Sequence, residues 1–472
     1  MSAVVEKLWS YCHKLRHDGI GYTEYIEQLS FLLFLKLADE KAIDVPEGCD
    51  WQTLKALSGP DLIDGYDEII KTLRTSGGFM GSMFANARSL FTKPVTLKEL
   101  IRLIDEESWA EMDADIKGDA YEGLLEKAAS EGKKGAGQYF TPRPLIRSLM
   151  RCMKPSPLDT ATFTICDPAC GTGGFLLLAY EWFKRQTKGA FPREHAKRIK
   201  EATYHGQDNS VTPRRLALMN LYLHGLQPNI QRADTIYDPA PSARYDCVLT
   251  NPPFGSKGAG EVPTRDDFTV ETSNKQLNFL QHILKILKPG GRAAVVVPDD
   301  CLFRDKAAEV MEILMQDCNV HTLLRLPDGC FAPYTGTKAN VLFFQKGRST
   351  ERLWVVDNRT NVPSITKKAR PLTEGHFADF LECYGSDPNG RSARTDQGES
   401  GRWRSFTIEA IRDERKYNLD IKWLKDEKIV SAEDLGEPSD VADEILTLLA
   451  TATEEMEALA ELLNGEDVGA SA

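Results

Sequence analysis

Apolar positions in the first 130 residues recur at helical spacing, and few β-branched runs interrupt them. The clearest stretch is an apolar surface broken by polar residues, formed by Tyr25, Leu29, Leu32, Leu33, Leu35 and Leu37. This spacing is typical of helices that bury one face. The Gly- and Lys-rich stretch ASEGKKGAGQ, which follows Ala128, is typical of a linker or mobile loop. We therefore expect an N-terminal helical domain over residues 1–130.

The pattern changes after residue 138, where short β-branched runs alternate with helical stretches. Strands are predicted at 162–166, 203–207, 245–249, 293–297, 322–326 and 341–345. Helices are predicted between them at 175–185, 211–223, 276–287 and 307–316. This alternation indicates an α/β domain over 131–350 with a doubly wound, mainly parallel sheet that binds ligands at the carboxyl ends of its strands. The loop PDGCFAPYTGTK is too short for a crossover helix, so the last two strands should be antiparallel.

The C-terminal part divides into a polar segment and a predicted helix. Residues 351–438 are polar, and their pattern predicts no role. Over 439–465, apolar positions recur every three or four residues at Val441, Ile445, Leu448, Ala452, Met456, Leu459 and Leu463. Such a helix must bury its apolar seam, either on the body of the protein or against a partner helix. We assign it as a helix that docks a partner.

The net charge of the 472-residue chain is −12, from 58 basic and 70 acidic side chains. Twelve of the acids, and no lysine or arginine, lie within residues 431–472. The remainder of the chain is therefore balanced in charge and has room for a basic groove. The acidic total does not exclude nucleic acid as a substrate.

Three further features bear on the location of the protein. No apolar run approaches the roughly 18–20 residues that span a bilayer. The N-terminus lacks the basic and apolar regions of a secretion signal. The ten cysteines contain no C-x-x-C and match neither a zinc site nor a disulfide framework. We expect reduced thiols, no metal, no membrane contact and a cytoplasmic location.

The glycine cluster DPACGTGGF, residues 167–175, stands directly after a predicted strand and directly before a predicted helix. Glycines let the backbone turn tightly and approach a ligand, and the helix N-terminus offers free N–H groups. The spacing departs from G-x-G-x-x-G because Phe175 follows Gly174. The cluster favours an adenosyl ligand over a dinucleotide, although a simple strand-to-helix turn has the same pattern.

Two carboxylates follow later strands. Asp208 ends the strand at 203–207 and suits the acceptance of hydrogen bonds from two ribose hydroxyls, or the capping of the next helix. Asp234 follows a weaker strand pattern and is a candidate contact to an adenine amino group.

The sequence Asn251-Pro252-Pro253-Phe254 follows an apolar strand and should lie at the same sheet edge as the glycine cluster. The Asn251 side-chain oxygen and a backbone carbonyl held by the prolines can both accept hydrogen bonds from a planar NH2 group. These bonds draw the nitrogen lone pair out of conjugation with its ring. Phe254 supplies a face on which a flat base can stack. A Pro-rich turn after a strand is the alternative, but the nearby glycine cluster disfavours it.

Together with Gly137-Gln138-Tyr139-Phe140-Thr141-Pro142, these two clusters resemble the S-adenosylmethionine-dependent DNA adenine-N6 methyltransferases. More narrowly, GQYFTP after a helical domain, followed by TSNKQLNFLQHIL and TGTKANVLFF, resembles the modification subunit of type I restriction–modification systems. The resemblance covers residues 5–345 and, more loosely, the tail. It implies the seven-stranded, Rossmann-like methyltransferase sheet, mostly parallel with an antiparallel last strand, and S-adenosylmethionine as cofactor.

The resemblance also implies roles for individual residues. Tyr139, Phe140 and Thr141 would contact the methionine end of the cofactor. The complete predicted cofactor set is Gln138, Tyr139, Phe140, Thr141, Asp167, Ala169, Gly171, Thr172, Gly173, Asp208 and Asp234. The catalytic set, which would hold a flipped-out adenine, is Asn251, Pro252, Pro253 and Phe254.

The same chemistry predicts partners. A base inside a duplex must be flipped out to reach such a pocket, at a cost of about a few kcal/mol. Only 127 residues follow Gln345, which leaves little room for a domain that reads a long DNA sequence. We therefore expect double-stranded DNA as substrate, a separate specificity subunit, and a restriction subunit as a further candidate partner.

The residues alone are compatible with two other functions. The N-P-P-[FY] motif also serves methyltransferases that act on protein glutamine or on RNA, and a non-catalytic scaffold would have a similar fold. The intact Asn251, Pro252 and Phe254 argue against the scaffold. A motor activity within this chain is disfavoured because G-x-x-x-x-G-K-[ST] is absent.

Overall fold

The computed structural model describes residues 9–10, 21–109, 111–112, 121, 123–128, 140–254, 262–304, 306–332, 335–366, 369–425, 442, 445–446, 449–453 and 456. The chain forms two compact units. The first holds residues up to 140 together with 169–180 and 187–234, and the second holds 141–168, 181–186 and the chain from 235 onward. The division predicted from the sequence, with boundaries near 130, 350 and 438, stays a prediction.

The N-terminal part of the first unit is helical, as the sequence predicts. Its helices are α2 (Tyr22–Glu40), α3 (Trp51–Ala56), α4 (Gly59–Thr75), α5 (Gly78–Phe84) and α6 (Pro94–Asp105). The start of α3 is capped by Asp50, whose carboxylate accepts a hydrogen bond of 2.8 Å from the Thr53 N–H. α2 is buried on most of its surface because other helices cover it on several sides.

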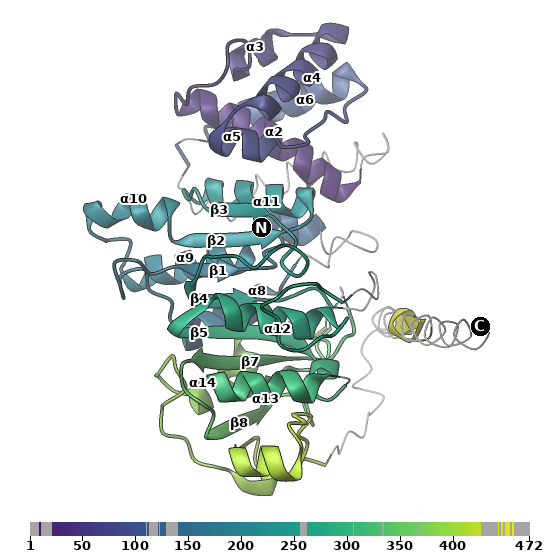
Figure 1. The fold of residues 1–472 in the computed structure, drawn as a ribbon. Coiled ribbons are helices and arrows are strands. Elements are labelled where there is room, and N and C mark those ends of the chain that lie inside the picture. The colour runs from purple at the N-terminus through teal and green to yellow at the C-terminus, as the bar shows by residue number, and fades with distance from the viewer. Residues whose placement is uncertain are drawn as a thin grey trace, which may run out of the picture. The chain divides into compact units, whose positions relative to one another are not determined.

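The rest of the first unit supplies α10 (Arg193–Glu201), β2 (Tyr204–Asp208), α11 (Val211–Leu223), β3 (Asn229–Arg232) and the start of α9 (Gly174–Gln186). β2 and β3 pair in parallel, with Asp208 opposite Arg232. α11 is buried almost completely, since α2 and α5 pack against it (Figure 1). The helical region therefore buries its core against this part of the chain.

The second unit is built on strands β1 (Ile165–Asp167), β4 (Tyr245–Thr250), β5 (Leu287–Pro298), β6 (Cys318–Arg325), β7 (Ala339–Lys346), β8 (Arg352–Asp357) and β9 (Trp403–Thr407). Their order in the sheet is β1-β4-β5-β7-β6-β8-β9. β1, β4 and β5 are parallel, whereas β7 runs antiparallel to both of its neighbours, β5 and β6. The predicted antiparallel pairing of the last two strands is confirmed.

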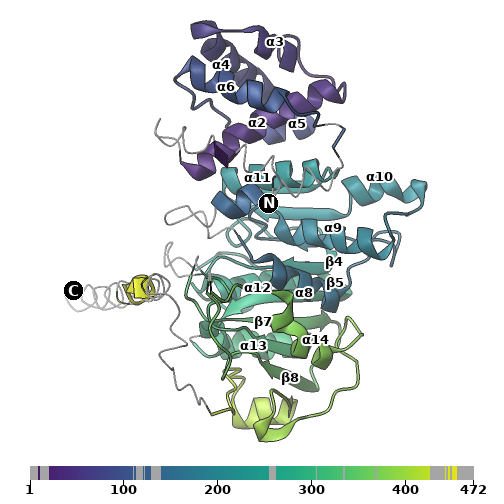
Figure 2. The same ribbon diagram turned by 180° about the vertical axis from the view of Figure 1, so that it is seen from behind.

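Helices cover both faces of this sheet, which explains why its central strands are apolar along their length. α12 (Lys275–Ile286) and α13 (Ala307–Asp317) lie on one face (Figure 1). α8 (Arg143–Met153) and α14 (Ala378–Tyr384) lie on the other (Figure 2). The side chains between α12, α13 and the sheet form a core of buried residues that includes Leu280, Val295 and Leu342.

The strand count corrects the sequence prediction. The described residues form nine strands rather than seven. The two additional strands are β8, parallel to β6, and β9, antiparallel to β8. Both lie in the segment 351–438 that the sequence pattern left without a role.

Two further observations concern the predicted tail and the membrane. The predicted helix at 439–465 lies outside the described residues, apart from the isolated positions given above. Among the helices that the structure describes, none is both long and apolar enough to cross a membrane.

Candidate functional site

Asp167 is buried at the carboxyl end of β1 and is tied to the neighbouring strand. Its Oδ1 accepts a hydrogen bond of 2.6 Å from the Thr250 hydroxyl at the end of β4. β1 and β4 are parallel partners, with Cys166 opposite Val248. This bond fixes the carboxyl ends of the two strands against each other, immediately before Asn251.

The glycine turn follows in the first unit and approaches β2 closely. The Cys170 N–H donates to the Gln207 carbonyl at 2.9 Å. Gly171 and Gly173 have φ angles of 51° and 81°, a conformation that glycine adopts without strain. A Cβ atom at Gly173 would lie 3.3 Å from the Ala217 Cβ on α11. The sequence requirement for glycine here therefore comes from both the turn and the close packing of α11.

Asp208 is placed by two backbone N–H groups. Its Oδ2 accepts from Gly171 at 3.1 Å, and its Oδ1 accepts from Ser210 at 2.8 Å. Burial raises the pKa of Asp208 to about 6, although both N–H groups act in the opposite direction. The carboxylate joins the glycine turn to the start of α11 and keeps lone pairs for a further donor.

Asp234 also lies near this group. The Asn209 side chain donates to the Asp234 carboxylate at 3.4 Å, which places Asp234 beside the residue that follows Asp208. The structure therefore brings together the two carboxylates and the glycine turn that the sequence predicts.

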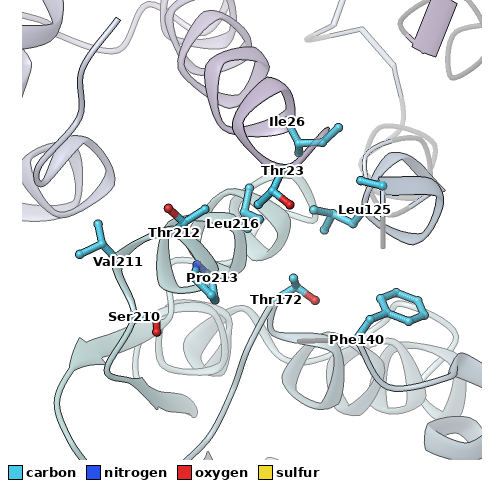
Figure 3. Close-up of a pocket in the computed structure, with 11 residues that line it drawn as sticks. Thr23, Ile26, Leu125, Phe140, Thr172, Ser210, Val211, Thr212, Pro213 and Leu216 are labelled. Carbon is cyan, nitrogen blue, oxygen red and sulfur yellow. The ribbon is translucent and has the colours of Figure 1, made fainter. Parts of the chain in front are cut away.

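A cavity of about 290 Å³ borders the glycine turn within the first unit (Figure 3). Two predicted cofactor residues, Phe140 and Thr172, line it. The first turn of α11 forms a second side, and Thr23 and Ile26 of α2 form a third. No sequence pattern indicates these α2 residues, because only the folded chain brings α2 beside α11. Predicted residues Gln138 and Tyr139 lie outside the described residues.

Asn251 directly follows β4 and has a fixed amide. Its Nδ2 donates a hydrogen bond of 3.0 Å to the Thr141 hydroxyl. Its Oδ1 is buried and has no hydrogen-bond partner among the residues that the structure describes. A buried acceptor without a partner is unfavourable, so it marks a position where a ligand donor is expected. The sequence predicted Thr141 as a cofactor contact and gave no indication that it orients Asn251.

Phe254 is half-buried and packs edge-to-face against Phe331, with ring centroids 5.6 Å apart and an interplanar angle of 90°. Phe331 is buried and lies in the loop between β6 and β7. The sequence predicts this loop only as a strand connection, so the prediction does not include Phe331. Its aromatic residue at the turn was the available signal.

Comparison with known proteins adds to this geometry. A family model described as N-6 DNA Methylase matches residues 112–432, and one described as HsdM N-terminal domain matches residues 4–104. The chain belongs to the N-6 DNA methylase family. The predicted activity is confirmed by this membership: the chain is an S-adenosylmethionine-dependent DNA adenine-N6 methyltransferase of the type I modification-subunit class.

Individual relatives are similar to this N-6 DNA methylase over nearly its full length. The StySPI methylase subunit of Salmonella potsdam is 39% identical, over 98% of this chain and 96% of the relative. The EcoKI methylase subunit of Escherichia coli strain K12 is 38% identical over the same shares.

Solved structures confirm the Rossmann-like methyltransferase fold. The crystal structure of the EcoKI M protein is 34% identical, with a TM-score of 0.55 and coverage of 100% of this chain and 97% of that one. A chain from a study of complex assembly in a type I restriction–modification system is 28% identical. Its TM-score is 0.74, and the match covers 98% of this chain and 99% of that chain.

Proposed function

We propose that Asn251, Pro252, Pro253 and Phe254 hold the flipped-out adenine during methyl transfer to its N6 atom. The observation that carries this proposal is the Asn251 amide. The Thr141 hydroxyl accepts a hydrogen bond from the Asn251 Nδ2, while the Asn251 Oδ1 has no partner among the described residues. An amide held in this way presents an oriented acceptor to the N–H of an amino group.

The reaction follows from this acceptor. Bound S-adenosylmethionine supplies an electrophilic methyl group on its sulfonium. The Asn251 Oδ1 and the Pro252 carbonyl accept hydrogen bonds from the two N–H groups of the adenine amino group. The N6 lone pair therefore turns out of the ring plane. Held in this direction, the lone pair would face the methyl group that the bound cofactor supplies, and N6 would release one proton to water once it is methylated. Phe254 stacks on the base, so the adenine keeps one orientation.

The described residues fit the cofactor. Asp208 has lone pairs for ribose hydroxyls, and Gly171 and Gly173, which both have positive φ angles, place no side chain in the turn. We assign Phe140, Thr141, Asp167, Ala169, Thr172 and Asp234 to the same function, together with Gln138 and Tyr139 from the sequence.

Cofactor affinity should depend on the ionisation of Asp208. Burial raises the pKa of Asp208 to about 6, so lowering the pH through 6 protonates the acceptor. We expect the Kd for S-adenosylmethionine to rise as the pH falls from 7.5 to 5, by up to about tenfold per pH unit below the pKa. Calorimetric titration across this range measures the effect. The same titration of Asp208→Asn should show weak binding with a flat profile, and an equally steep profile there would assign the dependence to another group.

We further propose that the chain acts within a type I complex on double-stranded DNA. A specificity subunit would read the sequence, the segment 439–465 would dock a partner, and a restriction subunit would join for cleavage. The study of complex assembly in a similar system supports this proposal. We also propose a cytoplasmic location, because the ten cysteines of the sequence contain no C-x-x-C and no spacing typical of a disulfide framework.

The test is transfer of a labelled methyl group from S-adenosylmethionine to unmethylated DNA, with and without the specificity subunit encoded beside this chain. We expect N6-methyladenine, identified by mass spectrometry, only when both subunits are present. Transfer by the chain alone would preserve the chemistry and overturn the division of labour. Label in protein or RNA, and none in DNA under either condition, would overturn the choice of substrate.

A further inference from the structure

The helix α12 is buried on nearly all sides, and four of its buried side chains are polar. Gln276, Asn278, Gln281 and His282 are exposed by only 6%, 1%, 4% and 1%. Burying a polar side chain is costly unless it is hydrogen-bonded, by about 1–3 kcal/mol in proteins. These four polar side chains therefore need hydrogen-bond partners within the second unit.

Two of these side chains bind the backbone of the segment that precedes α12. The Gln281 Oε1 accepts from the N–H groups of Thr269 and Val270 at 2.9 and 2.8 Å, and its Nε2 donates to the Val270 carbonyl at 2.9 Å. The Asn278 Nδ2 donates to the Thr272 carbonyl at 2.8 Å. These bonds replace the backbone pairing that a strand would give this segment, and they hold residues 269–272 against α12.

His282 extends the network to a buried arginine. Burial lowers the pKa of His282 to about 3, so its ring is neutral and Nδ1 accepts from Arg265 at 2.9 Å. Arg265 also donates to the Thr235 carbonyl at 2.7 Å and forms an ion pair with Asp267. The Thr235 hydroxyl in turn donates to the Pro168 carbonyl at 2.6 Å.

Gln276 differs from these residues because it contacts the catalytic motif. Its Nε2 donates to the Pro253 carbonyl at 2.9 Å. This carbonyl belongs to the peptide group that leads into Phe254, so the bond fixes the plane of that peptide. The Asn251 side chain is fixed separately by Thr141. The two ends of the motif are thus oriented by hydrogen bonds from different segments.

We propose that Gln276 is a positioning residue for methyl transfer, which acts through the Pro253 carbonyl to set the direction of the Phe254 ring. The proposal rests on the proposed function of Asn251–Phe254. Without the bond, the Pro253–Phe254 peptide can rotate, and the base stacks in several orientations. A displacement of about 1 Å at a reacting group is enough to slow a reaction by about 10²-fold. The cofactor contacts do not include Gln276, so its loss should leave cofactor affinity unchanged.

The experiment compares Gln276→Met with Asn278→Leu in the complex with the specificity subunit. Both changes remove one buried amide from the same helix while keeping the volume similar, but only the first removes a bond to the catalytic motif. Titration with S-adenosylmethionine counts folded sites, so that kcat refers to folded protein in both variants. We expect Gln276→Met to lower kcat by about 10- to 100-fold. We also expect its KM for DNA and its Kd for the cofactor to stay within about threefold, and Asn278→Leu to keep kcat within about threefold.

The two proposals fail in different ways. A Gln276→Met enzyme with the kcat of Asn278→Leu would show that Gln276 is only structural and overturn the positioning role. A wild-type complex that transfers no methyl group to DNA would instead overturn the proposed function itself. If Gln276→Met does not fold, Gln276→Glu keeps the size of the side chain without an amide donor, and the same comparison applies.

Discussion

Replacing Asn251 by alanine should lower kcat for DNA methylation by about 10³-fold, equivalent to about 4 kcal/mol in the activation barrier. The substitution removes the oriented acceptor that draws the N6 lone pair out of the adenine ring. Because Asn251 acts on the base, the Kd for S-adenosylmethionine should change by less than about threefold. Transfer of labelled methyl groups under single-turnover conditions measures the chemical step directly.

A matched control is available in the same unit. Asn358 is buried, and its Nδ2 donates one hydrogen bond of 2.8 Å, to the His376 carbonyl. Asn358→Ala should therefore lower stability by about 1–3 kcal/mol while kcat per folded site stays near the wild-type value. An Asn251→Ala enzyme with more than a tenth of the wild-type kcat would exclude Asn251 as the principal acceptor.

The largest expected effect on stability is at Arg215. This side chain on α11 is 2% exposed, forms an ion pair with Glu27 of α2, and donates at 2.9 Å to the Met83 carbonyl and also to the Ala85 carbonyl. Burial lowers the pKa of Arg215 to about 10, so it remains charged at neutral pH. Arg215→Met would leave the Glu27 carboxylate, which is 15% exposed, without its cation. We expect a loss of about 3–5 kcal/mol in the free energy of unfolding.

Two comparisons separate the buried charge from simple loss of contacts. The double variant Glu27→Leu/Arg215→Met should recover most of the lost stability, because no uncompensated charge remains. Arg185→Ala removes an arginine that is 61% exposed and paired with Glu181, so it should cost less than about 1 kcal/mol. Urea unfolding followed by circular dichroism gives all three values. A single variant as stable as the wild type would contradict the buried ion pair.

Sequence periodicity predicts the helical region and the alternating elements because their apolar residues repeat locally. The segment of β8 and β9 escaped prediction for a physical reason. β8 contains an apolar run of only four residues, 353–356, which is too short to distinguish a strand from a buried helix, and every residue of the edge strand β9 is half-buried, so β9 has no apolar alternation. Their strand character comes from pairing with β6 and with each other, which a local pattern does not contain.

The candidate site also depends on contacts between distant residues, which a local sequence pattern does not contain. Asn251 and the glycine turn were recognisable because short, contiguous motifs carry them. Thr141 lies 110 positions before Asn251, and nothing local to either residue predicts their hydrogen bond. Gln276 and Phe331 are likewise brought to the catalytic motif by the sheet and its covering helices.

The packing of α2 on α11 has a consequence for synthesis of the chain. α2 ends at Glu40, but α11, one of the helices that cover it, ends only at Leu223. At roughly 5–20 residues per second, a ribosome needs roughly 10–40 s to make the intervening chain. During this time the Glu27 carboxylate lacks its Arg215 cation, and the apolar surface of α2 lacks its packing against α11. A nascent chain of this length offers a binding surface to chaperones, and a fragment that stops near residue 130 would keep that surface exposed permanently.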